Sequence, residues 1–295
     1  DSSTSRGLGD VYKRQVLGSK NRKKLIRATI ESIRRNNFNG SMEIIVIDGG
    51  STDGTCDWLA KQRDVFTIIQ PNYNIVDLDG IQKRKHSWGE FMNIGFRYAH
   101  GKYIVMVSDD LILADDCLQN GYDAMEDFSK SGLKVGAGAF YFREYPRHNY
   151  YRVGTLGSYI ALNHGYYLKA ALEEIDYIDE KSYNFYCGDG DLIMRLNNAG
   201  WKTVDLPKCF ALHLNHKIFR HKSLPKWRIQ DENTFCDKYP GLVHIPSPRK
   251  ELKEKKINPF PFIKYASSFV FQGYIMRFLD KYLRCLLYTS DAADE

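Results

Sequence analysis

The centre of this sequence is the stretch Gly101-Lys102-Tyr103-Ile104-Val105-Met106-Val107-Ser108-Asp109-Asp110. Its apolar run from Tyr103 to Val107 is typical of a parallel strand buried on both faces. Asp109 and Asp110 follow at the carboxyl end of that strand, where open α/β sheets bind their ligands. Two adjacent carboxylates repel each other unless a cation lies between them, so the pair indicates a divalent metal site. The alternative is an acidic turn that caps the next helix.

Strands and helices alternate before this stretch. Apolar runs predict strands ending at 16–17 and over 42–47 and 65–69, and apolar spacings of three and four predict helices over 23–36, 56–59 and 88–100. This order predicts an α/β fold with a parallel sheet and right-handed crossovers. After it, we expect a helix over 118–129, a strand over 135–141, a loop over 142–152, a helix started by the acids at 189–191, a helix over 227–239 and a charged linker or helix end over 249–256.

Both ends of the chain look foreign to the protein. Residues 1–15 and 286–295 resemble translated adapter sequence, so they are excluded from the functional argument. A sheet that has lost its first strand exposes an edge, and we therefore expect residues near 11–17 to be drawn into the sheet as a surrogate strand. Gln15 is a poor filler for such a buried position.

Composition excludes several classes of protein. With 43% apolar residues the chain is globular rather than disordered, and its six cysteines form no CxxC pair or metal-finger spacing, which favours a reducing, cytosolic setting. The net charge is +6, and the part between the two foreign ends is more basic still, because those ends together are acidic. This excess suits a polyanionic ligand, an anionic membrane surface or nucleic acid.

Two other segments point to a phosphorylated ligand. Asp48 ends a predicted strand beside the glycine-rich turn 49–55, where an acid can accept hydrogen bonds from a nucleoside; a plain strand-turn-helix link explains it equally well. The basic triplet 83–85 follows the polar loop 71–85. It is either a solvated face or a contact for diphosphate.

Four motifs in order now resemble the nucleotide-sugar half of a family 2 glycosyltransferase: 48–55, Asn93-Ile94-Gly95, 99–104 and 108–110. The resemblance implies the GT-A fold, a Rossmann-like, mostly parallel sheet flanked by helices, with a C-terminal helical appendage here. It implies that the metal is held by Asp109, the leading ligand, with Asp110 beside it. It implies that Asp48 contacts the nucleoside. We also expect nucleotide contacts from Gly49 and Ser108 beside these acids, from Ser19 and Asn21 in the loop after the first strand, and from Arg84 of the basic triplet.

The segment around Gly188-Asp189-Gly190-Asp191-Leu192 is similar to the acceptor half of the same family. There the resemblance implies that Asp189 is the catalytic base, with Asp191 in reserve; helix capping is the alternative for both. It also places His213 at the metal, with His216 and His221 as stand-ins, and Mn²⁺ or Mg²⁺ as the ion. The sequence departs from the family pattern at Gly49, Val107 and Gly188.

The function implied is an inverting, metal-dependent transferase of the hexosyltransferase type, active in polysaccharide biosynthesis. It would move a sugar from a nucleoside diphosphate, with UDP favoured, to a glycan, a lipid-linked or another acceptor hydroxyl, without nucleic acid. The alternatives are a catalytically silent GT-A-like domain that binds nucleotide or glycan, and a nucleotidyltransferase.

The domain organisation expected is a GT-A domain over 16–222 and a helical extension over 223–285. Within the domain, a nucleotide-sugar half spans about 16–118 and an acceptor half about 119–222. Aromatic and basic residues over 258–284 suit peripheral membrane contact on the cytoplasmic face, a partner-binding helix, or a helix folded back on the domain.

Overall fold

The structure is a computed structural model, and it describes residues 13–76, 78–146, 148–214, 226–242 and 250–252, together with Phe271 and Tyr274. Its helices are α1 (Lys23–Arg34), α2 (Thr55–Leu59), α3 (Trp88–Tyr98), α4 (Cys117–Lys130), α5 (Lys169–Glu174), α6 (Gly188–Asn198) and α7 (Lys226–Lys238). Its strands are β1 (Lys13–Ser19), β2 (Met42–Asp48), β3 (Val65–Ile69), β4 (Asn74–Val76), β5 (Gln82–Arg84), β6 (Tyr103–Met106), β7 (Leu111–Leu113), β8 (Val135–Tyr145), β9 (Tyr151–Leu156), β10 (Tyr159–Ala161), β11 (Gly165–Leu168), β12 (Lys202–Leu214) and β13 (Lys250–Leu252).

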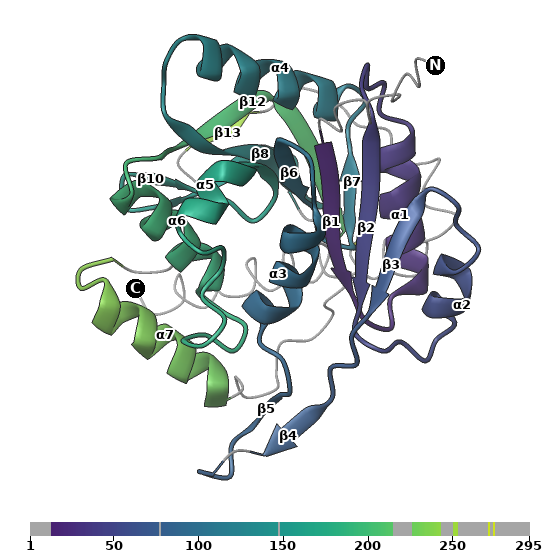
Figure 1. Ribbon diagram of the computed structural model, residues 1–295, viewed down its shortest axis with the longest axis vertical. Helices are drawn as coiled ribbons and strands as arrows, with labels where there is room; N and C mark the ends of the chain where they lie inside the picture. The colour runs from purple at the N-terminus through teal and green to yellow at the C-terminus, as the bar shows by residue number, and fades with distance from the viewer. Residues whose placement is uncertain are drawn as a thin grey trace, which may run out of the picture.

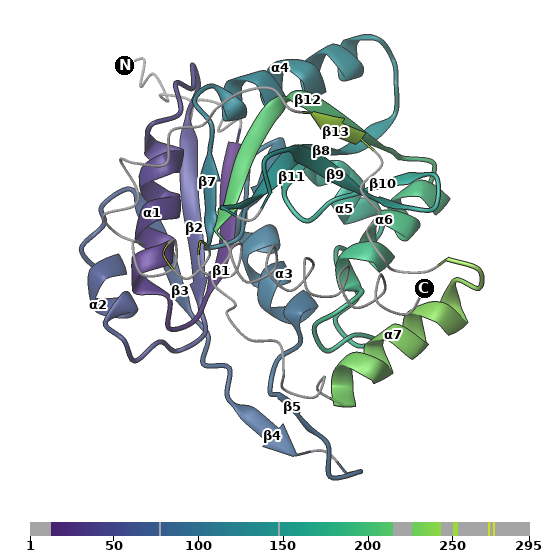
Figure 2. The same ribbon diagram turned by 180° about the vertical axis from the view of Figure 1, so that it is seen from behind.

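The large sheet confirms the predicted α/β architecture (Figure 1). Strands β6, β1, β2 and β3 are neighbours in that order and are parallel throughout. Beyond β6 the sheet becomes mixed, since β11 runs antiparallel to both β6 and β8, while β12 pairs with β8 in parallel. Right-handed crossovers put α1 and α2 on one face of the parallel part and α3 on the other, as the views from opposite sides show (Figures 1 and 2).

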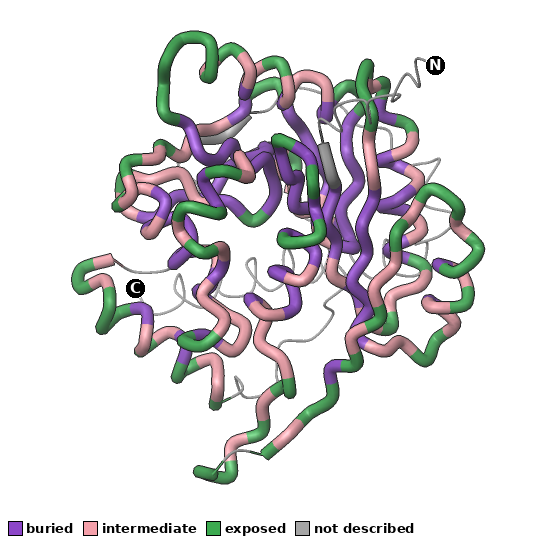
Figure 3. Tube along the Cα trace, in the orientation of Figure 1, coloured by how far each residue is buried: buried purple, intermediate pink, exposed green. Residues whose placement is uncertain are grey.

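Burial follows from the apolar runs of the sequence. Every residue of β6 is buried, and so are the last five of β2, which leaves a continuous core beneath the parallel strands (Figure 3). Helix α3 approaches the sheet closely at Gly95, where a Cβ atom would lie 2.5 Å from side-chain carbons of both Val16 and Ile47. Only glycine allows this contact, which fixes α3 against the strands that carry the site.

The strand expected near residues 11–17 is confirmed from Lys13 onward, while residues 11 and 12 lie outside the described residues. Strand β1 runs parallel to β2 and β6, with Gln15 beside Ile44 and Val105. The side chain of Gln15 is fully buried, and neither its amide nitrogen nor its oxygen has a hydrogen-bond partner among the described residues.

Three sequence-based expectations are wrong. The predicted loop 142–152 is mostly strand, because β8 continues to Tyr145 and β9 begins at Tyr151, with Phe142 paired to Arg152. The polar loop 71–85 contains the small antiparallel hairpin β4–β5. The charged segment 249–256 contains β13, which pairs with β9. For β8 and β13 the partner strands, β12 and β9, lie far away in the sequence, so the local pattern does not reveal the pairing. The β4–β5 hairpin pairs within the loop itself, but its two strands have three residues each and carry no apolar alternation.

No helix among the described residues is long and apolar enough to cross a bilayer. Apart from Phe271 and Tyr274, which are helical and exposed, the segment 258–284 lies outside the described residues. The expected membrane contact through that segment therefore stays a prediction.

Candidate active site

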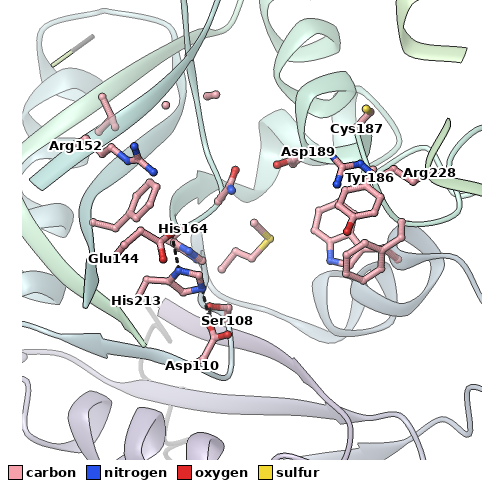
Figure 4. Close-up of a pocket in the computed structure, with 18 of the residues that line it drawn as sticks. Ser108, Asp110, Glu144, Arg152, His164, Tyr186, Cys187, Asp189, His213 and Arg228 are labelled. Atoms are coloured by element: carbon pink, nitrogen blue, oxygen red, sulfur yellow. Dashed lines mark hydrogen bonds and ion pairs between the residues drawn. The ribbon is translucent and has the colours of Figure 1, made fainter. Parts of the chain in front are cut away.

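Two adjoining cavities open at the carboxyl ends of β1, β2 and β6. The smaller, of about 240 Å³, lies between the loop after β1, Gly49 after β2, α3 and the Ser108-Asp109 turn. The larger, of about 570 Å³, lies between Asp110, strands β8, β9 and β12, the segment before α6, and α7 (Figure 4). The side chains that line both are Arg22, Trp88, Met106, Ser108, Asn163 and Phe185.

The two acids after β6 both contact Arg22 but line different cavities. Asp109 accepts hydrogen bonds from Ser19 Oγ at 2.8 Å and from Arg22 Nη1 at 2.8 Å, and it lines the smaller cavity. Burial raises the pKa of Asp109 to about 6, although the Arg22 guanidinium opposes the rise. Asp110 lines the larger cavity, where its Oδ1 accepts a hydrogen bond from Ser108 Oγ at 2.5 Å and its Oδ2 lies 3.3 Å from Arg22 Nη1.

His213 lies between two carboxylates. Its Nε2 is 3.3 Å from Asp110 Oδ1, and its Nδ1 is 3.0 Å from Glu144 Oε1 of the paired strand β8 (Figure 4). Burial would lower the pKa of His213, but Asp110 and Glu144 outweigh burial and hold the pKa well above its ordinary value. The structure thus brings together Asp110 and His213, two of the three predicted metal ligands, in the larger cavity, while Asp109 faces Ser19 and Arg22 instead.

The donor set limits how a cation could be held. Among the described residues, no three His, Cys, Asp or Glu side chains form a cage for a metal ion. Asp110 and His213 nevertheless offer one oxygen and one nitrogen facing the same cavity. That pair fits a divalent cation whose remaining ligands are substrate phosphates and water, since Mg²⁺ and Mn²⁺ need few protein ligands where phosphates complete the shell. Alternative histidines 216 and 221 lie outside the described residues.

Positive charge collects at the smaller cavity. Lys20, Arg22 and Arg84 all line it, and the Arg84 guanidinium lies 5.2 Å from the ring centre of Phe185. Burial, and then the charge of Arg22, lowers the pKa of Arg84. Two guanidinium groups that repel each other in a partly buried crevice favour an anionic ligand between them.

The residues predicted to meet the nucleoside divide into two groups. Gly49, Ser19, Arg84 and Ser108 line the smaller cavity. Asp48 lines neither cavity: its buried carboxylate accepts hydrogen bonds from the backbone nitrogen of Ser51 at 2.6 Å and from Ser51 Oγ at 2.7 Å. Asn21 likewise lies outside both cavities and ties the loops after β1 and β2 together, because its Oδ1 accepts from the Thr52 nitrogen at 2.7 Å.

The two acids at the start of α6 differ in access. Asp189 lines the larger cavity, on the side opposite Asp110 and His213 (Figure 4). Asp191 is fully buried away from it, and its Oδ1 and Oδ2 bind the side chains of Tyr183, Arg195, Lys238 and Tyr239.

The sequence analysis did not assign a role to several residues that line the larger cavity. Glu144, Arg152 and His164 come from the β8–β11 part of the sheet, and Arg228 comes from α7. The alternating pattern of β8 could have placed Glu144 on the same face as Phe142, had that segment been recognised as a strand. His164 and Arg228 carry no local signal, because only the fold brings them to the cavity.

The sequence matches a known protein family over more than half of its length. The model of Glycosyl transferase family 2 matches residues 16–195, more than half of the chain. This chain belongs to Glycosyl transferase family 2. Among curated protein sequences, none matches it.

Solved structures with the same fold include other glycosyltransferases. The mannosyltransferase PcManGT from Pyrobaculum calidifontis, in complex with GDP-Man and Mn²⁺, is 16% identical, with a TM-score of 0.53 over 97% of this chain and 82% of its own. TarS 1-349 from S. aureus, in complex with UDP-GlcNAc, is 14% identical, with a TM-score of 0.53 over 89% of this chain and 72% of its own. These likenesses show that the family 2 protein has the GT-A fold.

Proposed function

We propose that this glycosyltransferase moves a hexose from a nucleoside diphosphate sugar to an acceptor hydroxyl, with inversion at the transferred carbon and with help from a divalent cation, Mn²⁺ or Mg²⁺. The observation that supports it is the placement of Asp189 opposite the Asp110 and His213 pair in one cavity of about 570 Å³. That volume lies in the range of small-molecule sites.

The two cavities suit the two parts of a donor. The smaller, with Lys20, Arg22 and Arg84, is suited to the nucleotide and its diphosphate, and the larger to the sugar and the acceptor. We favour UDP because the family favours it. The TarS structure is a complex with UDP-GlcNAc and the PcManGT structure a complex with GDP-Man, so both nucleosides belong in the test.

The reaction proposed is a single displacement. The acceptor oxygen forms a bond to the anomeric carbon as the bond from that carbon to the diphosphate oxygen breaks, and Asp189 takes the acceptor proton. Asp191 cannot share this role, because other side chains occupy both its oxygens away from the cavity. Arg22 contacts both acids and lines both cavities, so its guanidinium can face the departing phosphates.

A divalent cation bound by Asp110 and His213 would neutralise charge on the leaving diphosphate. The hydrogen bond between His213 Nδ1 and Glu144 orients the ring so that Nε2 points toward Asp110. Gly188 stands where the family has an acid. A Cβ atom on residue 188 would lie 3.2 Å from the ring of Trp88, so Trp88 fills the space beside the proposed base.

The acceptor class follows from the family rather than from the cavity. We propose a glycan or lipid-linked hydroxyl in polysaccharide biosynthesis, at the cytoplasmic face of a membrane, with residues 258–284 as the peripheral contact.

The test is a panel of UDP- and GDP-hexoses incubated with Mn²⁺, Mg²⁺ or a chelator, read as released nucleoside diphosphate and as glycosylated product. Asp189→Asn should lower turnover by roughly 10² to 10⁴ and leave nucleotide affinity in place, since a general base contributes about that factor. Binding without turnover in the unaltered protein would favour the silent domain, and a requirement for a nucleoside triphosphate would favour a nucleotidyltransferase.

A further inference from the structure

Helix α7 lies beyond the family match, which ends at residue 195, yet it forms one side of the larger cavity. Arg228 and Glu232 of α7 line that cavity, and they are joined by a hydrogen bond of 2.8 Å. Figure 1 shows α7 alongside the segment that leads into α6. The helix therefore supplies polar side chains to the same space as the proposed base.

Asp231, the residue between them, holds the neighbouring segment. Its carboxylate is buried and accepts hydrogen bonds from the backbone nitrogens of Asn184, Phe185 and Tyr186, each at 2.8 Å. Three backbone donors on one carboxylate make a strong, charge-assisted anchor. The backbone of residues 184–186 is thus tied to α7 rather than to the sheet.

Two of those three residues, Phe185 and Tyr186, form an aromatic wall of the larger cavity. The ring of Tyr186 stacks on Trp227 of α7, with centroids 5.4 Å apart and planes at 20°. The Arg228 guanidinium lies 4.6 Å from the centre of Tyr186 (Figure 4). The wall leads through Cys187 directly to Asp189.

The far end of α7 is tied to α6. Lys238 Nζ and the hydroxyl of Tyr239 donate to Asp191 Oδ1 at 2.6 and 2.9 Å. Asp191 also accepts from Arg195 Nε at 2.7 Å. Residues 184–191, with Asp189 among them, are consequently braced against α7 at both ends.

We propose that Phe185, Tyr186 and the cavity-facing side of α7 form the acceptor wall, which binds a sugar ring of the acceptor, and that Asp231 is its positioning residue. Aromatic rings beside an arginine and a carboxylate suit a carbohydrate, whose C–H faces pack on rings while its hydroxyls take hydrogen bonds. The proposal rests on the proposed function, because it assigns the second substrate of that reaction.

The test compares Asp231→Asn with Asp237→Asn, an equivalent change at an exposed position of the same helix. The acceptor probes are p-nitrophenyl glycosides, and the donor is the nucleotide sugar that the unaltered protein uses. With Asp231→Asn we expect the acceptor KM to rise at least about tenfold, equivalent to about 1.4 kcal/mol, while kcat and nucleoside diphosphate affinity change less than about threefold. Asp237→Asn should match the unaltered protein.

Hydrogen exchange measures the anchor without any substrate. The amides of Asn184, Phe185 and Tyr186 should lose protection in Asp231→Asn and keep it in Asp237→Asn, even where no nucleotide sugar proves to be a donor. Should Asp231→Asn not fold, Arg228→Gln tests the wall itself with the same expected rise in acceptor KM. Unchanged protection of these amides, or an unchanged acceptor KM in a folded Asp231 or Arg228 variant, would overturn the proposal.

Discussion

At the scale of single residues, the two acids after β6 have different surroundings. Asp109 is enclosed by Ser19 and Arg22, whereas Asp110 meets His213 in the larger cavity. The family resemblance alone favoured Asp109 as the leading metal ligand. The geometry leads us to propose Asp110 in that position, with Asp109 as the residue that fixes Arg22.

This assignment predicts different losses from two matched substitutions. Asp110→Asn should weaken Mn²⁺-dependent binding of UDP at least about tenfold, since it removes a charged oxygen ligand. Asp109→Asn should weaken it less, because an amide oxygen can still accept from Ser19 or Arg22. Calorimetry with UDP at saturating Mn²⁺ measures both, and a greater loss from Asp109→Asn would return the leading position to that residue.

We expect His164 to make the free energy of unfolding depend on pH. Burial, followed by the charge of His213, lowers the pKa of His164 to about 4, from an ordinary value near 6.5. Between these values the unfolded chain binds the proton and the folded chain does not, so the free energy of unfolding falls as pH falls from about 6.5 to about 4. The loss should reach about 3 kcal/mol, at about 1.4 kcal/mol for each pH unit.

The measurement is urea unfolding of the unaltered protein and of His164→Asn across that pH range. The difference in stability between the two should shrink steadily toward pH 4. A constant difference would mean that His164 titrates in the folded protein as it does in the unfolded chain.

At the scale of elements, apolar runs were sufficient for the parallel half of the sheet. Strands β2, β3 and β6 and helices α1, α3 and α4 agree with their predicted ranges to within about two residues, because each is long or strongly periodic. The mixed half was harder. Phe142, Glu144 and Arg152 belong to strands whose polar residues face a cavity, and their pattern therefore resembles that of a loop.

The sequence likewise predicted only part of the candidate site. Asp110, Asp189 and Gly49 follow strands or open a helix, so a motif could place them at the cavity edge. The contributions of Arg228 and Asp231 depend on a helix packed against a distant segment, which no local pattern encodes.

Strand β1 offers a test of our prediction that residues 1–15 are foreign to the protein. The fully buried amide of Gln15 has no partner among the described residues, and an unsatisfied buried amide costs about 1–3 kcal/mol. Gln15→Val should therefore raise the free energy of unfolding by about that amount, as it also suits a parallel strand. Chemical denaturation measures the gain. An equal or lower stability would show that this position tolerates the amide and that its origin has no energetic consequence.

At the scale of the whole molecule, the boundary expected at residue 222 divides a packed unit. Phe235 of α7 is fully buried in a second apolar cluster with Leu156, Tyr183, Cys187 and Met194. Removing a buried phenylalanine side chain costs about 3–5 kcal/mol. A chain that ends at residue 222 should thus be less stable by at least about 3 kcal/mol, measured by urea unfolding against the full chain. The same unfolding midpoint for both would contradict this and make α7 an independent appendage.

The six side chains shared by the two cavities have a thermodynamic consequence. Arg22, Trp88 and Phe185 are among the side chains that line both cavities. Binding in one cavity that shifts these side chains changes affinity in the other. Linkage then requires reciprocity: the factor by which a nucleotide changes the affinity for an acceptor equals the factor by which that acceptor changes the affinity for the nucleotide. We therefore expect the two proposed substrates to be coupled through these shared side chains, whichever of them binds first.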